Sequence, residues 1–388
     1  MDRIYMDNGS SMAVDPRVLE FAIKFLKDDT GNPSSLHSVG TEAKEIMNEA
    51  RTRVAELINA EKPEAIIFTA SATEANNLAI KGTALRNINK GKEVISSAIE
   101  HISVLNPMKD LQKNGFTYNQ VPVDSDGMIR MDKLREMVSV NTTVSSIMYA
   151  NGEIGTIQPI KEISELVHEK NNGMYLHVDA ADANGWVPID VQNEGIDLLT
   201  LSSNTMGGPQ GAGALYVRPG VRIQPVILGG GQERGLRSGT ENIFAITGMG
   251  EAARIAKQEL TSESQRIKEI RDRLIDGILT VEKSYLTGHG GNRLPNHASF
   301  RFDFIEGESI LLNMDMYNIQ VSTGSACSSK TLEPSHVLLS IGLSHEQAHG
   351  SMVLTLGKNN NIDQVPKVVE AITETVERLR KLSPLVKN

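Results

Sequence analysis

The chain has 388 residues, of which 39% are hydrophobic and 22% are charged, and its formal net charge is −9. This length is sufficient for two domains with separate cores, and the composition is typical of a soluble globular protein. An acidic balance without a long basic run argues against nucleic acid as the main partner, and no run approaches the ~20 apolar residues that a membrane-spanning helix needs.

The first residues and the cysteine content indicate a cytoplasmic location. The opening segment, MDRIYMDNGSS, lacks the basic and then apolar pattern of a signal peptide. Cys327 is the single cysteine, so no disulfide can form within the chain. We therefore expect a reducing, cytoplasmic environment and no association with a membrane.

Strands alternate with helical stretches over the first two thirds of the chain. A helix enters at Asp15-Pro16, with proline in its usual place at a helix start, and a second helix is expected over about 42–60. Apolar runs predict strands over 65–69, 93–97, 143–149, 175–178, 198–202 and 214–217. This alternation predicts a mostly parallel sheet with helices on both faces.

Polar residues follow or end four of these strands. They are His101, Asn151, Asp179 and Ser202. Ligands of such sheets bind beyond the carboxyl ends of the strands, so we expect these four side chains to converge on one site.

The last third of the chain reads as a smaller α+β unit. A charged helix over about 262–281 leads into it, and strands and helices alternate from 298 to 382. We expect residues 1–14 to join this small C-terminal domain, residues 15–258 to form a large domain, and residues 259–388 to form the small one. A cysteine loop spans 322–335.

Three segments together carry a specific resemblance to a known family. These are the turn-rich loop over 31–37, the glycine-dense segment over 229–242 and the sequence Gly-Ser-Ala-Cys-Ser over 324–328. In this order they resemble the cysteine desulfurases of the NifS/IscS type, and the resemblance extends over essentially the whole chain. It implies an α/β fold of the PLP-dependent transferase (aspartate aminotransferase-like) class, with a mostly parallel seven-stranded sheet in the large domain. It also implies pyridoxal phosphate (PLP) as cofactor.

The resemblance implies a cofactor site. Asp179 would pair with the pyridine nitrogen, which makes the ring an electron sink, and His101 would stack on the ring as a catalytic residue. The phosphate contacts would come from Ala72, Thr73, Ser202 and, from the second subunit of a homodimer, Thr240. Without the resemblance, Asp179 is equally explained as a helix cap, and His101 would more often be structural.

Five residues in four segments depart from the family pattern. Thr205 stands in the place of the Schiff-base lysine, and threonine can neither form an imine nor move the substrate's α-proton. Asn204 replaces a phosphate-binding histidine. Asp182 replaces a glutamine that bonds the ring hydroxyl, and Gly152 an asparagine near the same oxygen; a carboxylate there repels the ionised hydroxyl. Val353 replaces the arginine that binds the substrate carboxylate.

Cys327 is the family's catalytic residue that this chain keeps. A lone cysteine is often a small buried apolar residue, but this loop is polar and includes Lys330, which favours a reactive thiolate. The resemblance implies that this thiol carries a persulfide to an acceptor such as an IscU-like iron–sulfur scaffold protein. Its thiolate could also ligate a metal, as in a shared iron–sulfur cluster.

These observations leave three functions open. The first is an active L-cysteine desulfurase, a sulfurtransferase that makes L-alanine and an enzyme persulfide, using another lysine such as Lys330. The second is a desulfurase-like partner in iron–sulfur cluster assembly, in which Cys327 supplies sulfur or a thiolate and the protein's own activity is weak or absent. The third is non-covalent binding of a phosphorylated ligand. The departures favour the second, and whether the protein is an enzyme stays open.

Overall fold

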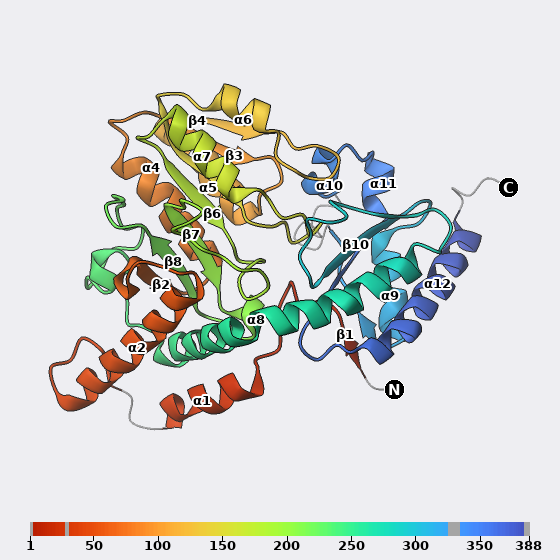
Figure 1. Ribbon diagram of the computed structural model, residues 1–388, viewed down its shortest axis with the longest axis horizontal. Coiled ribbons are helices and arrows are strands. Elements are labelled where there is room, and N and C mark those ends of the chain that lie inside the picture. The colour runs from red at the N-terminus through yellow and green to blue at the C-terminus, as the bar shows by residue number, and fades with distance from the viewer. Residues whose placement is uncertain (1–2, 28–30, 325–333, 384–388) are drawn as a thin grey trace.

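The computed structural model describes residues 3–27, 31–324 and 334–383 (Figure 1). Its main layer is a seven-stranded sheet in the order β2-β8-β7-β6-β5-β3-β4. The strands are β2 (Ile66–Thr69), β3 (Glu93–Ser97), β4 (Thr117–Val121), β5 (Thr142–Met148), β6 (Tyr175–Asp179), β7 (Leu198–Ser202) and β8 (Gly213–Val217). Strand β8 runs antiparallel to β2 and β7, and the other pairs are parallel. The mostly parallel sheet expected from the sequence is confirmed.

Helices cover both faces of this sheet. On one face lie α2 (Ser38–Leu57), α7 (Ile160–Lys170) and α8 (Ile243–Ile278), and on the other α3 (Ala72–Asn77), α4 (Thr83–Arg86) and α5 (Ile102–Leu111). Neighbouring strand residues point to opposite faces of the sheet. Ile66 and Phe68 of β2 therefore pack in the core on the side of α2, α7 and α8, while Ile67 packs with α3 on the other side. Helix α1 (Pro16–Lys27) packs along α8, and α6 (Met131–Met137) lies beside β4 and α7.

Helix α8 differs from the sequence expectation. It has 36 residues and begins at Ile243, well before the charged stretch over 262–281 that the sequence indicated. Its first half is buried and contains glycines, which lower helix propensity and hide the pattern. Gly250 has a structural reason: a Cβ there would lie 2.5 Å from the Cα of Ala50 in α2, so the two helices approach closely only without a side chain.

A second, three-stranded sheet has the order β12-β10-β9 and is antiparallel. Its strands are β9 (Ser284–Leu286), β10 (His297–Phe302) and β12 (Ser351–Thr355), with α9 (Gly307–Met316) and α12 (Val365–Leu382) packed beside it. The N-terminal β1 (Ile4–Tyr5) pairs in parallel with β11 (Ile319–Gln320), and α10 (His336–Ser340) and α11 (His345–His349) precede β12. The domain boundaries at 14 and 258 stay a prediction.

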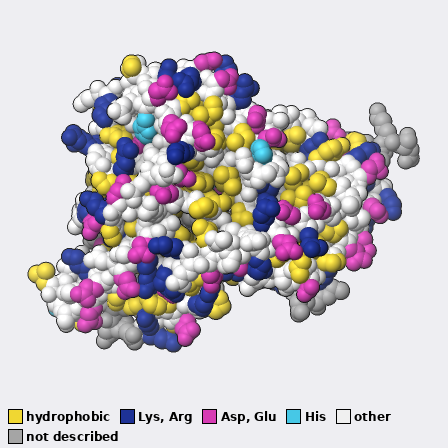
Figure 2. Space-filling view, in the orientation of Figure 1, with side chains coloured by type: hydrophobic (Ala, Val, Ile, Leu, Met, Phe, Trp, Pro, Cys, Tyr) yellow, Lys and Arg dark blue, Asp and Glu magenta, His cyan; other side chains and the backbone are white. Residues whose placement is uncertain are grey.

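Charged side chains of both signs are interspersed over the face of the molecule in Figure 2. In the part of the chain that the structure describes, no helix combines the length and the apolar character needed to cross a membrane.

Candidate functional site

A cavity of about 330 Å³ lies where the carboxyl ends of β3, β5 and β6 face the second sheet. The segments that follow these three strands contribute His101, Asn151 and Asp182 to its lining. The N-terminal segment closes it through Asp7, and β12 through Val353. This position follows the rule that such sheets bind ligands beyond the carboxyl ends of their strands.

Asp179 and His101 are joined by a chain of hydrogen bonds. Asn76 Nδ2 donates to Asp179 Oδ2 at 2.7 Å and to Ser103 Oγ at 2.8 Å, and Ser103 Oγ lies 2.7 Å from His101 Nδ1. Burial raises the pKa of Asp179, and its hydrogen bonds and nearby His101 oppose the rise. His101 Nδ1 also accepts from the Ser103 N–H and caps α5, whereas Asp179 Oδ1 accepts from the Ala181 N–H in a turn that does not continue into a helix. The sequence did not single out Asn76 or Ser103.

The expected phosphate contacts are only partly assembled within one chain. Gly213 of β8 lies opposite Ser202, and a Cβ on it would be 2.8 Å from the Ala72 nitrogen, so the start of α3 and the end of β7 meet here. Ser202 Oγ, however, already donates to Asn204 Oδ1 at 2.6 Å. Thr240 is exposed, and its contact with a second subunit's cofactor stays a prediction, as does the role of Thr73.

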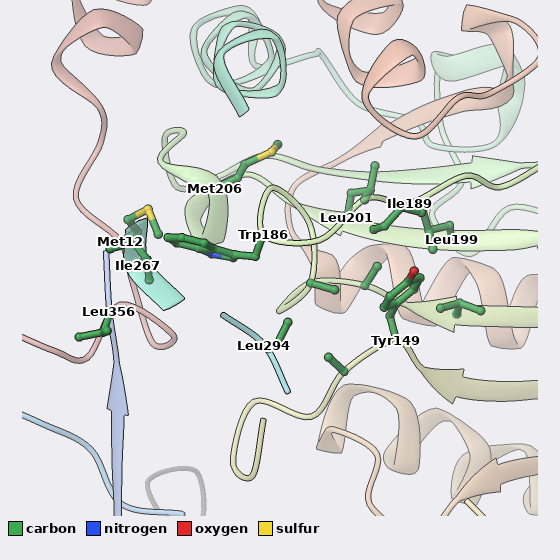
Figure 3. Packing of buried hydrophobic residues seen from close by; sticks show 14 of the residues in the cluster. Met12, Tyr149, Trp186, Ile189, Leu199, Leu201, Met206, Ile267, Leu294 and Leu356 are labelled. Atoms are coloured by element: carbon green, nitrogen blue, oxygen red, sulfur yellow. The ribbon is translucent and has the colours of Figure 1, made fainter. Parts of the chain in front are cut away.

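Thr205 lies in a closed environment. Its Oγ1 donates to the Ala181 carbonyl at 2.5 Å and accepts from Asn184 Nδ2 at 3.2 Å. The space beside it measures about 10 Å³, which is roughly the room for one water molecule. Figure 3 shows Met12 and Ile267 beside the indole of Trp186, and Met206, which follows Thr205, belongs to the same buried cluster. The immediate surroundings of Thr205 therefore leave little room for a longer side chain.

Asp182 and Gly152 are matched in shape. A Cβ built on Gly152 would lie 2.6 Å from Asp182 Oδ2 and 2.9 Å from its Cγ. The carboxylate therefore takes the space in which a side chain at position 152 would begin. Burial raises the pKa of Asp182 to about 7, and the charge of Asp179 adds to the rise.

Two further carboxylates line the cavity. Glu100 is fully buried; its Oε1 accepts from Ser97 Oγ at 2.5 Å and from the Met148 N–H at 2.8 Å, while Oε2 has no hydrogen-bond partner among the described residues. Glu153 accepts from the Ser335 hydroxyl. Burial raises the pKa of Glu100 to about 8 and that of Glu153 to about 7, with further increases from Asp179 and Asp182 respectively.

Glu100 and Glu153 were not among the site residues expected from the sequence. A signal was present, because each follows a predicted strand by only a few residues, in Ala-Ile-Glu-His and Asn-Gly-Glu-Ile. In an alternating sheet that position faces the site, whatever the residue type.

Val353 presents an apolar side chain to the cavity. It is 5% exposed, pairs with Ser299 of β10 and forms a bridge with Ser322. Cys327 and Lys330 lie outside the described residues. Among the described residues, no group of three or more His, Cys, Asp and Glu side chains is placed to hold a metal ion.

These residues do not fit PLP as a covalently held cofactor. Asp179, which the resemblance would pair with the pyridine nitrogen, is buried and joined to His101 through Asn76 and Ser103, but only His101 of the two lines the cavity. Thr205 offers no amine, and its hydroxyl is already bonded to Ala181 and Asn184. Asp182 lines the cavity, and by the family resemblance it takes the place of a glutamine that would bond the ring hydroxyl; its ionised carboxylate would repel an ionised oxygen there.

Comparison with known proteins gives one consistent family. The model of the aminotransferase class-V family matches residues 4–368. Cysteine desulfurase IscS 1 of Archaeoglobus fulgidus is 52% identical over 381 residues, covering 98% of this chain and 99% of that protein. Cysteine desulfurase IscS of Methanosarcina thermophila is 46% identical over 382 residues, or 98% of this chain and 94% of that protein.

Solved structures agree with these relatives. A structure described as a NifS-like protein superposes with a TM-score of 0.91 at 36% identity, covering 97% of this chain and 100% of that one. A NifS-like protein from Rickettsia africae gives a TM-score of 0.87 at 30% identity, over 98% of this chain and 100% of that one.

Proposed function

Because this chain belongs to the class-V aminotransferases and, among them, to the cysteine desulfurase family, we propose that it serves iron–sulfur cluster assembly through Cys327. Members of this family depend on PLP. In this chain the protein's own PLP-dependent desulfurase activity is weak or absent. The observation that carries the proposal is the environment of Thr205, whose hydroxyl is bonded to Ala181 and Asn184 in a packed region.

The family's Schiff-base lysine, whose place Thr205 takes, has two functions. It is the group that forms the imine with the cofactor and the base that moves the substrate's α-proton. General acid–base catalysis alone contributes about 10²–10⁴-fold to a rate. Thr205 supplies neither function, since a hydroxyl held between a carbonyl and an amide is not a base at neutral pH.

The substrate end of the cavity supports the same proposal. Val353 offers no cation for an amino acid's carboxylate, and Glu100, Glu153 and Asp182 surround it with acidic groups. L-Cysteine carries its own carboxylate, so this cavity disfavours it. The same acidity makes a phosphorylated, anionic ligand the less favoured alternative.

In this proposal Cys327 accepts sulfur from a donor and passes it to a scaffold protein. Its thiolate attacks the outer sulfur of a donor persulfide, the donor's S–S bond breaks, and the donor leaves as a thiolate. Cys327 then holds the persulfide until a cysteine of a scaffold protein attacks it in the same way, with no net oxidation or reduction. Alternatively the thiolate ligates iron of a cluster shared with the scaffold. A homodimer, an IscU-like scaffold and a cytoplasmic location belong to this proposal.

The first test is spectroscopic. Purified protein is mixed with PLP and then with L-cysteine, while absorbance and sulfide release are followed. We expect no imine band near ~420 nm and no sulfide. A band together with sulfide would contradict the proposal and indicate another lysine, and the Lys330→Met variant would then show whether that lysine is Lys330.

A second test addresses Cys327 directly. A scaffold protein of the IscU type is co-expressed with the full chain and with the Cys327→Ser variant. We expect both to bind the scaffold, and only the wild type to hold a cluster or to transfer sulfur from a low-molecular-weight persulfide. Equal cluster content and transfer in the variant would refute the role of Cys327.

A further inference from the structure

The cavity described above is lined by carboxylates from four separate segments: Asp7, Glu100, Glu153 and Asp182. In the described part of the chain, its lining includes no lysine or arginine, and His101 is its single basic residue. Charges of one sign that face a common space repel one another, and that repulsion is relieved by a cation placed between them.

The protein itself satisfies these carboxylates only with neutral donors. Asp7 accepts from Ser10 Oγ at 2.6 Å, and Glu153 from the Ser335 hydroxyl. Glu100 Oε1 accepts from Ser97 and Met148, but its buried Oε2 has no partner in the part of the chain that the structure describes. None of the four takes part in an ion pair with another described residue. Burying unpaired carboxylates is costly, and this cost raises the pKa of Glu100, Glu153 and Asp182; a positively charged occupant would stabilise their ionised forms.

The geometry favours an organic cation over a metal ion. A metal ion needs several ligands converging on one point, and the described residues provide no such group. The cavity measures about 330 Å³, which is the size of a small-molecule site. Between its acidic groups the cavity has an apolar wall formed by Ile99, Met148 and Val337. Such a wall suits a ligand with a short hydrocarbon chain and polar ends.

We propose that this cavity binds a small organic amine, a primary amine or short diamine that carries no carboxylate. The ammonium group lies among Glu100, Glu153 and Asp182, and the carbon chain lies against the apolar wall that ends at Val353. This goes beyond the proposed function and does not depend on Cys327. Selectivity comes from charge, because a zwitterionic amino acid brings a carboxylate into an acidic cavity.

Two probes separate this from binding of the family's substrate. Cysteamine and L-cysteine share the amine and the thiol and differ by one carboxylate. Both are titrated calorimetrically into the full chain under reducing conditions, with putrescine as a thiol-free diamine. We expect cysteamine and putrescine to bind, and L-cysteine to bind at least about tenfold more weakly.

Variants locate the site. Asp182→Asn and Glu153→Gln remove one charge each with little change of shape, and each is expected to weaken putrescine at least about tenfold. Glu282→Gln is the matched control, since the Glu282 side chain is 85% exposed and outside the cavity lining. Thermal unfolding of both cavity variants checks that they remain folded.

Several outcomes would overturn the inference. Tighter binding of L-cysteine than of cysteamine, unchanged putrescine affinity in both cavity variants, or an equal loss in Glu282→Gln would each do so. Calcium or magnesium binding that depends on Asp182 and excludes putrescine would assign the cavity to a metal instead. Amine binding that persists in Cys327→Ser would separate this inference from the function proposed for Cys327.

Discussion

The carboxylate of Asp182 occupies the space in which a side chain at position 152 would begin, with Oδ2 only 2.6 Å from a Cβ built on Gly152. The two residues lie on different segments, one after β5 and one after β6. Each is a departure from the family pattern, and the structure shows that they are departures that fit together. The two positions therefore share one space, and a side chain at one restricts the side chain at the other.

This relationship predicts a coupling between the two positions. Gly152→Ala should lower the free energy of unfolding by about 1–3 kcal/mol, because the new methyl group meets the Asp182 carboxylate. In the Asp182→Ala background the same change should cost less. Urea unfolding of the four proteins in a double-mutant cycle measures the coupling. Gly290→Ala is the control, since a Cβ there meets nothing within 4 Å; equal costs at 152 in both backgrounds would contradict the prediction.

Restoring the lysine alone should not restore the enzyme. The space beside Thr205 is about 10 Å³, so Thr205→Lys forces its side chain into packed surroundings and should cost about 1–3 kcal/mol of stability. Sulfide release with PLP and L-cysteine should stay at background. Adding Gly152→Asn, Asp182→Gln and Val353→Arg to the same chain should raise it. Activity in the single variant equal to that of the fourfold variant would show that the other departures are neutral.

The acidic cavity predicts a pH dependence of stability. The pKa of Asp182 and of Glu153 is raised to about 7, and that of Glu100 to about 8, whereas an unfolded carboxyl titrates near about 4. Between these values the folded state binds more protons than the unfolded state, so these groups make stability fall as pH rises. The slope is at most about 1.4 kcal/mol per pH unit for each group.

Urea unfolding from pH 5 to pH 8 measures this effect in wild type and in Asp182→Asn. Buried His177 and His297, whose pKa is lowered to about 3, act in the opposite direction below about pH 6.5. They are the same in both proteins, so the difference between the two curves reports Asp182 together with its effect on the pKa of Glu153. We expect the variant to gain relative stability toward pH 8; parallel curves would show that Asp182 is charged throughout.

Asn76 should be a structural requirement of the site. It is fully buried and donates to both Asp179 and Ser103. Asn76→Ala removes the donor to Asp179 Oδ2 and leaves only the Ala181 N–H on Oδ1, which should cost about 1–3 kcal/mol. Thermal unfolding measures the loss, and Asn106→Ala, at an exposed asparagine of α5, is the control. Equal melting temperatures for the two variants would argue that the chain from Asp179 to His101 carries no stability.

Much of the architecture could be predicted from the sequence. The apolar runs identified six of the seven strands of the main sheet, and the resemblance supplied its topology. The missed strand, β4, is an edge strand in which only Val121 is buried, so it has no apolar run to detect. The start of α8 was missed because glycines that permit close helix packing also weaken the helical pattern.

The sequence by itself determined the fold class, the family and the loss of the Schiff-base lysine at Thr205, because strand periodicity and motif order are local properties of the chain. Only the tertiary structure decided that Asp182 fills the space at Gly152, that Asn76 joins Asp179 to His101, and that Glu100 and Glu153 share one cavity. These are contacts between side chains from segments that are far apart in the sequence. The packing of strands and helices determines which side chains line one cavity and what net charge that cavity has. No local sequence pattern encodes this.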